Sequence, residues 1–380
     1  MALVVFAGTI GRSVIGGLSW DNMQYLVGLA ELGHDVYYLE DCGEESWVYD
    51  WDAQQLTNDL AYPTSYLQDC LEPVGLADRW IYRAGANSTG IEIAEFDAIC
   101  AEADLLIAWG DALTTWRAAY DSPRRRAFID VDPGFTQISL AQGQHGLHKA
   151  VDNCESVFTT SPRIGTPTSP LPTYGRQWHH LWPPVALTEW PYVPDAPSQG
   201  LACIMNWKGF HDVEYQGAFY GQKNAEFEKF ADLPRRITRE IQMVQIGADA
   251  EELQRAGWRV RSGEELTRTP SKYRELIQSC WGEFGIAKHG YAAMQQAWFS
   301  GRSTCFLASG RPAIVQDTGV GAELHAEGGL LTFRTAVDAA RCIAEVQSDY
   351  AAHSRAARDL AERTFAATEV LPRMLEIAAR

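Results

Sequence analysis

One β-α-β unit can be recognised in residues 3–40, LVVFAGTIGRSVIGGLSWDNMQYLVGLAELGHDVYYLE. Residues 3–7 are continuously apolar, as expected of a parallel strand whose two faces are both covered. A glycine-rich loop follows, and a helix is expected over residues 19–32, with Gly33 as its stop. Residues 36–39 then form a second strand. The unit predicts a Rossmann-like domain built on a parallel sheet.

The alternation of strands and helices continues along the chain and is interrupted once. Residues 161–200 hold nine of the seventeen prolines and show little periodicity, which indicates a connection between two domains. The expected strands are 105–109, 127–131, 157–160, 201–206, 242–247 and 313–316, and the expected helices are 225–231, 273–278 and most of 336–380. The pattern predicts two doubly wound α/β domains of similar size, with ligands at the carboxyl ends of their strands.

The bulk properties favour a soluble two-domain protein. A chain of 380 residues exceeds what one core usually serves, and a formal net charge of −17 disfavours nucleic acid or an anionic membrane as the main partner. The eight cysteines form no CxxC pair and predict buried free thiols in a reducing compartment. Neither a signal peptide nor a membrane span is expected, so the predicted location is cytoplasmic.

The stretch most informative about chemistry is residues 282–321, GEFGIAKHGYAAMQQAWFSGRSTCFLASGRPAIVQDTGVG. It predicts a glycine-bearing loop at Glu283 to Lys288, then a helix that starts near Arg302 and stops at Gly310. Unpaired N–H groups at a helix start suit a diphosphate, and the hydroxyls of Ser303 and Thr304 strengthen that interpretation. The alternative is that these residues only cap a helix.

Residues 306–315, FLASGRPAIV, resemble the helix-turn-strand segment that helps to form the nucleotide-sugar pocket of GT-B glycosyltransferases. Glu283-Phe284-Gly285 is similar to the acidic turn of the retaining, glycogen-synthase-like (group 1) members. The loop at Gly16-Gly17 is similar to the loop that approaches the donor phosphates from the first domain. Tyr291 and Cys305 depart from the pattern, because each stands where relatives often carry a glutamate. The stereochemical class therefore stays open.

The resemblance implies a GT-B fold of two Rossmann-like domains facing a cleft. The expected domains are 1–180 on the acceptor side, a connection at 181–200, 201–360 for the nucleotide sugar, and 361–380 as a helix packing back on the first domain. The implied activity is hexosyl transfer (EC 2.4 class) from a UDP-, TDP- or GDP-sugar co-substrate to an unidentified acceptor, with no metal and no tightly bound cofactor.

The expected site residues fall into two groups. The catalytic candidates are Asp132, at the carboxyl end of a predicted strand, together with Glu283 and His145. A basic group must stabilise the departing diphosphate, for which Lys223 competes with Lys208 and Lys288. The candidates for donor binding are Gly16, Gly17, Lys223, Gly285, Lys288, His289, Arg302, Ser303, Thr304, Asp317, Thr318 and Gly319.

Several alternatives remain open. Asp130-Val131-Asp132 matches the D-x-D metal signature of the other large glycosyltransferase class, although two carboxylates supply few of the ligands that a divalent cation needs. A nucleotide-sugar epimerase would share the donor block. An NAD-type dehydrogenase would use Glu40 on the ribose, but the glycines do not match G-x-G-x-x-G. A two-lobed sugar-binding protein would usually be exported. The sequence leaves the oligomeric state undetermined.

Overall fold

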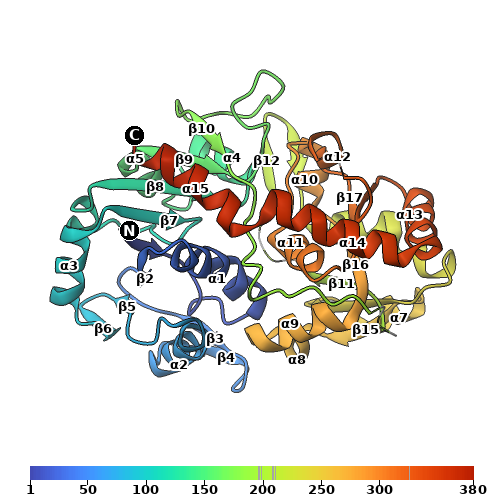
Figure 1. Cartoon of the computed structure of the whole chain (residues 1–380), viewed down its shortest axis with the longest axis horizontal. Coiled ribbons are helices and arrows are strands. Elements are labelled where there is room, and N and C mark those ends of the chain that lie inside the picture. Colours follow the sequence, from blue (N-terminus) through green and yellow to red (C-terminus); the bar gives the residue numbers. More distant parts are fainter. Residues whose placement is uncertain (196, 198, 208, 210, 325) are drawn as a thin grey trace. The chain divides into compact units, whose positions relative to one another are not determined.

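The computed structural model describes residues 1–380 except 196, 198, 208, 210 and 325. Lys208, a candidate for the basic group, therefore lies outside the described residues. The chain forms two compact units. Unit 1 comprises residues 1–160, 164–186 and 367–380, and unit 2 comprises residues 161–163 and 187–366. Both units are α/β, and their elements are labelled in Figure 1.

Unit 1 is built on an eight-stranded sheet of order β10-β9-β8-β7-β1-β2-β5-β6. All neighbours are parallel except β5 and β6. Its strands are β1 (Leu3–Ala7), β2 (Asp35–Asp41), β5 (Trp80–Ala84), β6 (Asn87–Gly90), β7 (Leu105–Trp109), β8 (Arg125–Asp130), β9 (Ser156–Thr159) and β10 (Trp178–His180). Its helices are α1 (Gly16–Glu31), α2 (Ala61–Leu71), α3 (Ile93–Glu102), α4 (Phe135–Gln142), α5 (His148–Asn153) and α15 (Ala367–Ala378). The first strand is central, so the expected doubly wound order is present.

Unit 2 is built on a six-stranded sheet of order β15-β14-β11-β16-β17-β18, in which every neighbouring pair is parallel. Its strands are β11 (Gln199–Asn206), β14 (Ile241–Ile246), β15 (Arg259–Ser262), β16 (Cys280–Gly285), β17 (Ala313–Gln316) and β18 (Leu330–Phe333). Its helices are α6 (Lys223–Phe227), α7 (Ala250–Arg255), α8 (Gly263–Thr267), α9 (Pro270–Ser279), α10 (His289–Met294), α11 (Gly301–Ala308), α12 (Val320–Glu323), α13 (Ala336–Ser348) and α14 (Tyr350–Leu360). A π-helical turn over 361–365 follows α14.

Each unit also carries a small antiparallel hairpin outside its main sheet. In unit 1, β3 (Val48–Asp50) pairs with β4 (Gln55–Thr57). In unit 2, β12 (Val213–Tyr215) pairs with β13 (Ala218–Tyr220). Neither hairpin is evident from the sequence pattern.

The helix α15 belongs to unit 1 although it follows unit 2 in the chain. It packs on α1, where Gly28 leaves room for it (Figure 1). A Cβ at position 28 would stand 2.5 Å from the Cβ of Ala367 and 2.7 Å from Cδ1 of Leu371. The backbone N–H of Ala367 also donates to the carbonyl of Val185 at 2.9 Å. The expectation of a final helix on the first domain is confirmed.

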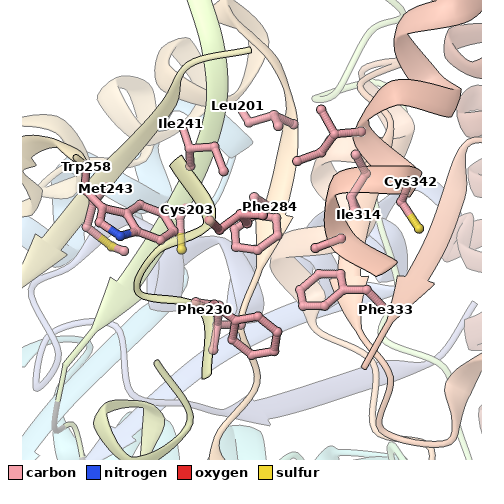
Figure 2. Close-up of a cluster of buried hydrophobic side chains, with 14 of the residues drawn as sticks. Leu201, Cys203, Phe230, Ile241, Met243, Trp258, Phe284, Ile314, Phe333 and Cys342 are labelled. Carbon is pink, nitrogen blue, oxygen red and sulfur yellow. The ribbon is translucent and has the colours of Figure 1, made fainter. Parts of the chain in front are cut away.

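The core of unit 2 is aromatic (Figure 2). The rings of Phe284 and Phe333 stack at 4.9 Å with an interplanar angle of 5°, and Phe230 meets Phe333 edge-on at 5.1 Å. Phe284 is fully buried on β16 and directs its ring into this cluster. Because side chains alternate along a strand, Glu283 and Gly285 project toward the opposite face of the sheet.

The structure corrects one expectation about local structure in this region. Glu283 and Gly285 were expected in a loop, but both lie in the buried strand β16. The sequence of β16, CWGEFG, contains two glycines and a charge and so lacks a strand's usual apolar run. A Cβ on Gly282 would stand 2.5 Å from the carbonyl oxygen of Pro312. The backbone just before β17 therefore approaches β16 closely, which favours glycine at this position.

All eight cysteines are free, and seven of them are buried. No helix in the described part of the chain combines the length and the apolar character that a membrane crossing needs.

Candidate functional site

The site develops at the point where the strand order of unit 2 reverses. From β11 the chain moves outward to β14 and β15, then returns to β16 on the other side of β11. Helices that start on either side of such a reversal diverge and leave a crevice at the carboxyl ends of the two central strands. The carboxyl ends of β11 and β16 therefore mark where a ligand is expected in this unit.

Glu283 and Arg302 form a buried ion pair at this position. Nε of Arg302 lies 2.7 Å from Oε1 of Glu283, and the Glu283 side chain is fully buried. Burial alone would lower the pKa of Arg302, but the charge and hydrogen bond of Glu283, together with Tyr273 and Cys203, outweigh it and the pKa is raised. Within the described residues, no donor reaches the other oxygen, Oε2 of Glu283. A buried carboxylate oxygen without a donor is costly, so this atom suits a hydroxyl group brought by a ligand.

Lys223 lies in the electrostatic field of the same pair. Burial and then the charge of Arg302 lower its pKa to about 7, although Glu283 acts in the opposite direction. Lys288 adds a further positive charge nearby. Arg302 and Lys223 thus both interact with the Glu283 carboxylate, Lys288 adds its charge beside Lys223, and the excess positive charge favours an anionic ligand.

The backbone around Lys223 is held by the start of α10. The N–H of His289 donates to the carbonyl of Gln222 at 3.3 Å, and the N–H of Gly290 donates to the carbonyl of Gly221 at 3.0 Å. Nδ1 of His289 accepts from the N–H of Gly221 at 3.1 Å. His289 therefore positions the loop that carries Lys223. The sequence had given no sign of the buried Gln222, which anchors that loop through Nε2 to the carbonyl of His211 at 3.0 Å.

The start of α11 is partly capped from within the chain. Oγ of Ser300 accepts from the N–H of Arg302 at 3.3 Å, and the carbonyl of Ser300 accepts from the N–H of Ser303 at 3.0 Å. The hydroxyl of Thr304 donates to the carbonyl of Gly301 at 2.7 Å. The helix therefore begins as predicted, but fewer free N–H groups remain there than the sequence suggested. The guanidinium of Arg302 is the main cationic feature at this helix start.

The loop after β17 is also held by internal bonds. Oδ2 of Asp317 accepts two bonds from Arg334, at 2.8 and 2.9 Å, and Oδ1 accepts from the N–H of Gly319 at 2.9 Å. The hydroxyl of Thr318 donates to the carbonyl of Trp298 at 2.6 Å. These interactions fix the shape of the loop and leave Asp317 and Thr318 less free for a ligand than expected.

In unit 1, Gly16 and Gly17 open α1, and the glycine-rich loop before them is clamped by Glu40. The carboxylate of Glu40 accepts from the N–H of Gly11 at 2.8 Å, the N–H of Arg12 at 2.6 Å and the hydroxyl of Tyr38 at 2.8 Å. Burial raises the pKa of Glu40, and Arg12 and these hydrogen bonds oppose that shift. Because its oxygens are occupied within the protein, Glu40 is poorly placed to bind a ribose as an NAD-type dehydrogenase would require.

Asp130 and Asp132 have different surroundings at the carboxyl end of β8. Asp130 is fully buried and accepts from Nε2 of Gln137 at 2.9 Å, Oγ1 of Thr159 at 2.8 Å and the N–H of Asp132 at 3.0 Å. Burial raises its pKa, and these bonds oppose the shift. Asp130 therefore organises the loop that carries the half-buried Asp132. His145 lies between α4 and α5, exposed and with a positive φ of 60°.

Two further features bear on what the protein can bind. Among the described residues, no group of three or more His, Cys, Asp or Glu is placed to hold a metal ion. A cavity of about 400 Å³ lies beside Gly200, Glu240 and Arg259, at the amino-terminal edge of the unit 2 sheet. That edge is opposite to the one where parallel sheets bind ligands, so this cavity is separate from the candidate site.

The fold is shared with solved glycosyltransferases, whereas neither a family model nor a curated protein matches the sequence. An alpha-glucosyltransferase (AGT) in complex with UDP is similar at a TM-score of 0.60 and 12% identity, covering 100% of this chain and 99% of that chain. Anabaena Alr3699/HepE in complex with UDP-glucose has a TM-score of 0.57 and 13% identity, with 99% of each chain covered.

AviGT4, a glycosyltransferase involved in avilamycin A biosynthesis, has a TM-score of 0.53 and 13% identity, covering 100% of this chain and 97% of that chain. Another AGT structure holds UDP and a 13-mer DNA containing a HMU base. Likeness at these identities establishes the architecture. The chain has the GT-B fold, two Rossmann-like units with a final helix returned to the first.

Proposed function

We propose that this protein is a glycosyltransferase that moves a hexosyl group from a nucleotide-diphosphate sugar to an acceptor, with the donor held by unit 2. One observation carries the proposal. Two buried or half-buried cations, Lys223 and Arg302, share one carboxylate at the reversal of the sheet, and Oε2 of that carboxylate has no donor within the described residues. A nucleotide sugar supplies both missing partners, negative phosphates and hydroxyl groups.

In this proposal the cations stabilise the leaving group. The bond between C1 of the sugar and the β-phosphate oxygen breaks, and its electron pair remains on the nucleoside diphosphate. Arg302, Lys223 and Lys288 offset the charge that develops on that group in a setting with little water, where such stabilisation is most effective. These cations can do the work for which other transferases use a divalent ion, so we propose a metal-independent reaction that continues in the presence of EDTA.

Glu283 is proposed to hold a hydroxyl of the sugar or the ribose through Oε2, while its other oxygen keeps Arg302 in place. Gly285 leaves space beside it, because a Cβ there would stand 3.3 Å from Oε1 of Glu283. The other donor-binding candidates retain lesser roles. His289 supports the lysine loop, Ser303 lies at the helix start, and the loop at Asp317 to Gly319 offers backbone groups.

The acceptor is proposed to be handled by unit 1, with Asp132 as the base that takes the proton of the attacking hydroxyl. Asp132 is half-buried at the carboxyl edge of its sheet, which is the expected place for such a group. His145 is a second candidate, and Gly16-Gly17 a proposed phosphate contact. The AGT neighbour has been captured with DNA, but the net charge of −17 favours an acceptor other than nucleic acid for this chain. Eight free thiols support a cytoplasmic location.

The test is a thermal-shift series with UDP, TDP, GDP, their glucose conjugates and NAD(P). A ligand that binds only the folded state raises the free energy of unfolding by mass action, and Tm rises with it. At a ligand concentration of about 100 times Kd, the added stability is about 2.7 kcal/mol. Three of the similar structures described above hold UDP or UDP-glucose, so UDP is the first nucleotide to examine. Stabilisation by a nucleoside diphosphate that disappears in Arg302→Ala supports the proposal. Stabilisation by NAD(P) alone would reject it. Conversion of the donor sugar without an acceptor would indicate an epimerase.

A further inference from the structure

The β3–β4 hairpin of unit 1 presents large apolar side chains to solvent. Trp47 is 56% exposed, Tyr49 39% and Leu56 64%. Trp47, Tyr49 and the half-buried Trp51 occupy alternate positions in and beside β3. Tyr49 pairs with Leu56 across the hairpin, and the rings of Tyr49 and Trp51 meet edge-on at 4.8 Å. We call these four residues the aromatic face.

The alternation is inverted relative to an ordinary surface strand. Ser46 before Trp47 and Val48 before Tyr49 are buried, whereas the larger rings of Trp47 and Tyr49 face outward. A strand that served only to cover the core would place its largest apolar side chains inward. Packing of the hairpin itself therefore gives no reason for two tryptophans and a tyrosine on the outer face.

The aromatic face is held in place rather than carried on a loose loop. The hydroxyls of Ser46 and Tyr82 lie 2.6 Å apart, and the hydroxyl oxygen of Tyr62 accepts from the backbone N–H of Trp51 at 3.1 Å. Oδ1 of Asp50 closes the turn by accepting from the N–H groups of Asp52 and Ala53 at 2.8 and 3.0 Å. A ligand would meet a preorganised surface, which reduces the entropy lost on binding.

The segment that carries this face is acidic in sequence. Residues 13–78 contain thirteen aspartates and glutamates and no lysine or arginine. Four exposed acids stand on the hairpin segment itself, Glu44, Glu45, Asp52 and Asp59. In addition, Nε1 of Trp47 donates to Oε2 of Glu45 at 3.0 Å, which increases the electron density of the indole ring. Electron-rich rings beside carboxylates attract cations.

We propose that the aromatic face binds a small amphipathic molecule that carries a protonated amine. The rings and Leu56 contact its apolar part, and the acids with the indole of Trp47 contact its ammonium group. A phosphorylated or nucleic-acid ligand would be repelled by the exposed acids of the hairpin segment. A second copy of the same face would bring the exposed carboxylates of two hairpin segments together, and neither segment carries a lysine or arginine to pair with them. Resting on the proposed glycosyl transfer, we further infer that this molecule is the acceptor.

The experiment compares three probes of one shape, 5-hydroxytryptamine, 5-hydroxytryptophol and 5-hydroxyindole-3-acetate. They differ in the charge of the side chain, and each carries a hydroxyl that can accept a sugar. Titration calorimetry at low salt measures their binding to the whole protein. We expect the amine to bind at least about five-fold more tightly than the neutral alcohol, because a cation–π contact of about 1 kcal/mol changes Kd by that factor. The acid is expected to bind most weakly of the three. Raising the salt concentration should reduce the difference in affinity between the amine and the neutral alcohol.

The variant Trp47→Ala/Tyr49→Ala should lose at least about five-fold in affinity for the amine. The matched control is Tyr174→Ala, which removes another exposed tyrosine of unit 1. Equal binding of amine and alcohol, unchanged binding in the double variant, or a dimer that the double variant dissociates would each overturn the proposal.

UDP stabilisation of the double variant separates this inference from the proposed function. If UDP stabilises neither protein while the amine still binds at the aromatic face, the transferase proposal fails and the binding site stands. If UDP binds normally but glucosylation does not favour the amine over the alcohol, the acceptor inference fails alone.

Discussion

Lys223 provides the sharpest test of the proposed donor site, because its pKa of about 7 predicts that binding of a diphosphate is coupled to uptake of a proton. The free protein is about one-half charged at this lysine at pH 7, about one-tenth at pH 8 and about one-hundredth at pH 9, by the usual titration relation. A bound diphosphate favours the ammonium form and raises the pKa again. Binding at pH 8 should therefore take up about 0.9 proton.

The same coupling fixes the direction of the pH dependence. Affinity is greatest below pH 7 and falls as the pH rises, because the proton must then be supplied on binding. With a pKa near 7 in the free protein and above 10 in the complex, Kd for UDP should rise about 50-fold between pH 7 and pH 9, which corresponds to about 2.3 kcal/mol.

Titration calorimetry in buffers of different ionisation enthalpy measures the protons directly. Lys223→Met should abolish the uptake and flatten the pH dependence, whereas Lys149→Met, at an exposed lysine of unit 1, should change neither. Wild-type uptake near zero at pH 8, or an equal uptake in Lys223→Met, would refute the assignment of Lys223 to the diphosphate.

Three other substitutions probe separate parts of the structure. Glu283→Gln leaves Arg302 as an unpaired buried charge and should lower the free energy of unfolding by about 3–5 kcal/mol in urea titrations; a loss below about 1 kcal/mol would contradict the buried pair. Gly28→Leu places atoms where α15 packs, so amide exchange in α15 should accelerate at least about tenfold while α11 is unchanged, and equal protection would argue against that packing. Glu40→Gln should cost about 2 kcal/mol, because an amide cannot replace both oxygens that accept from the glycine-rich loop, and an unchanged urea midpoint would count against the clamp.

The strands that were predicted well share a simple cause. The central strands β1, β7 and β17 are short apolar runs bounded by polar or glycine residues, and burial on both sides makes that pattern unmistakable. The helix α11 was placed correctly because Gly310 follows it and Pro312 prevents its continuation. Local composition was sufficient for these elements.

The parts that were missed depend on contacts between distant residues. Glu283 is a charge inside a strand, and only the pairing with Arg302, nineteen positions later, makes its burial tolerable. The occupation of Glu40 by the glycine-rich loop is likewise a long-range contact. The β3–β4 hairpin was not recognised because Tyr49 and Leu56 point outward, which leaves Val48 as the buried apolar residue of its strands. The low pKa of Lys223 arises from burial and a neighbouring charge, neither of which a single sequence displays.

The return of α15 to unit 1 makes unit 2 an insertion within unit 1, since residues 187–366 lie between two segments of the first unit. During synthesis, every residue of unit 2 emerges from the ribosome before residues 367–378, which cover α1. Until then, the side chains of α1 around Gly28 lack their covering helix. Unit 2 can therefore complete its core while unit 1 is still unfinished, although unit 1 begins first. The nascent protein can thus complete unit 2 as a folded body earlier than unit 1, which begins before it in the chain.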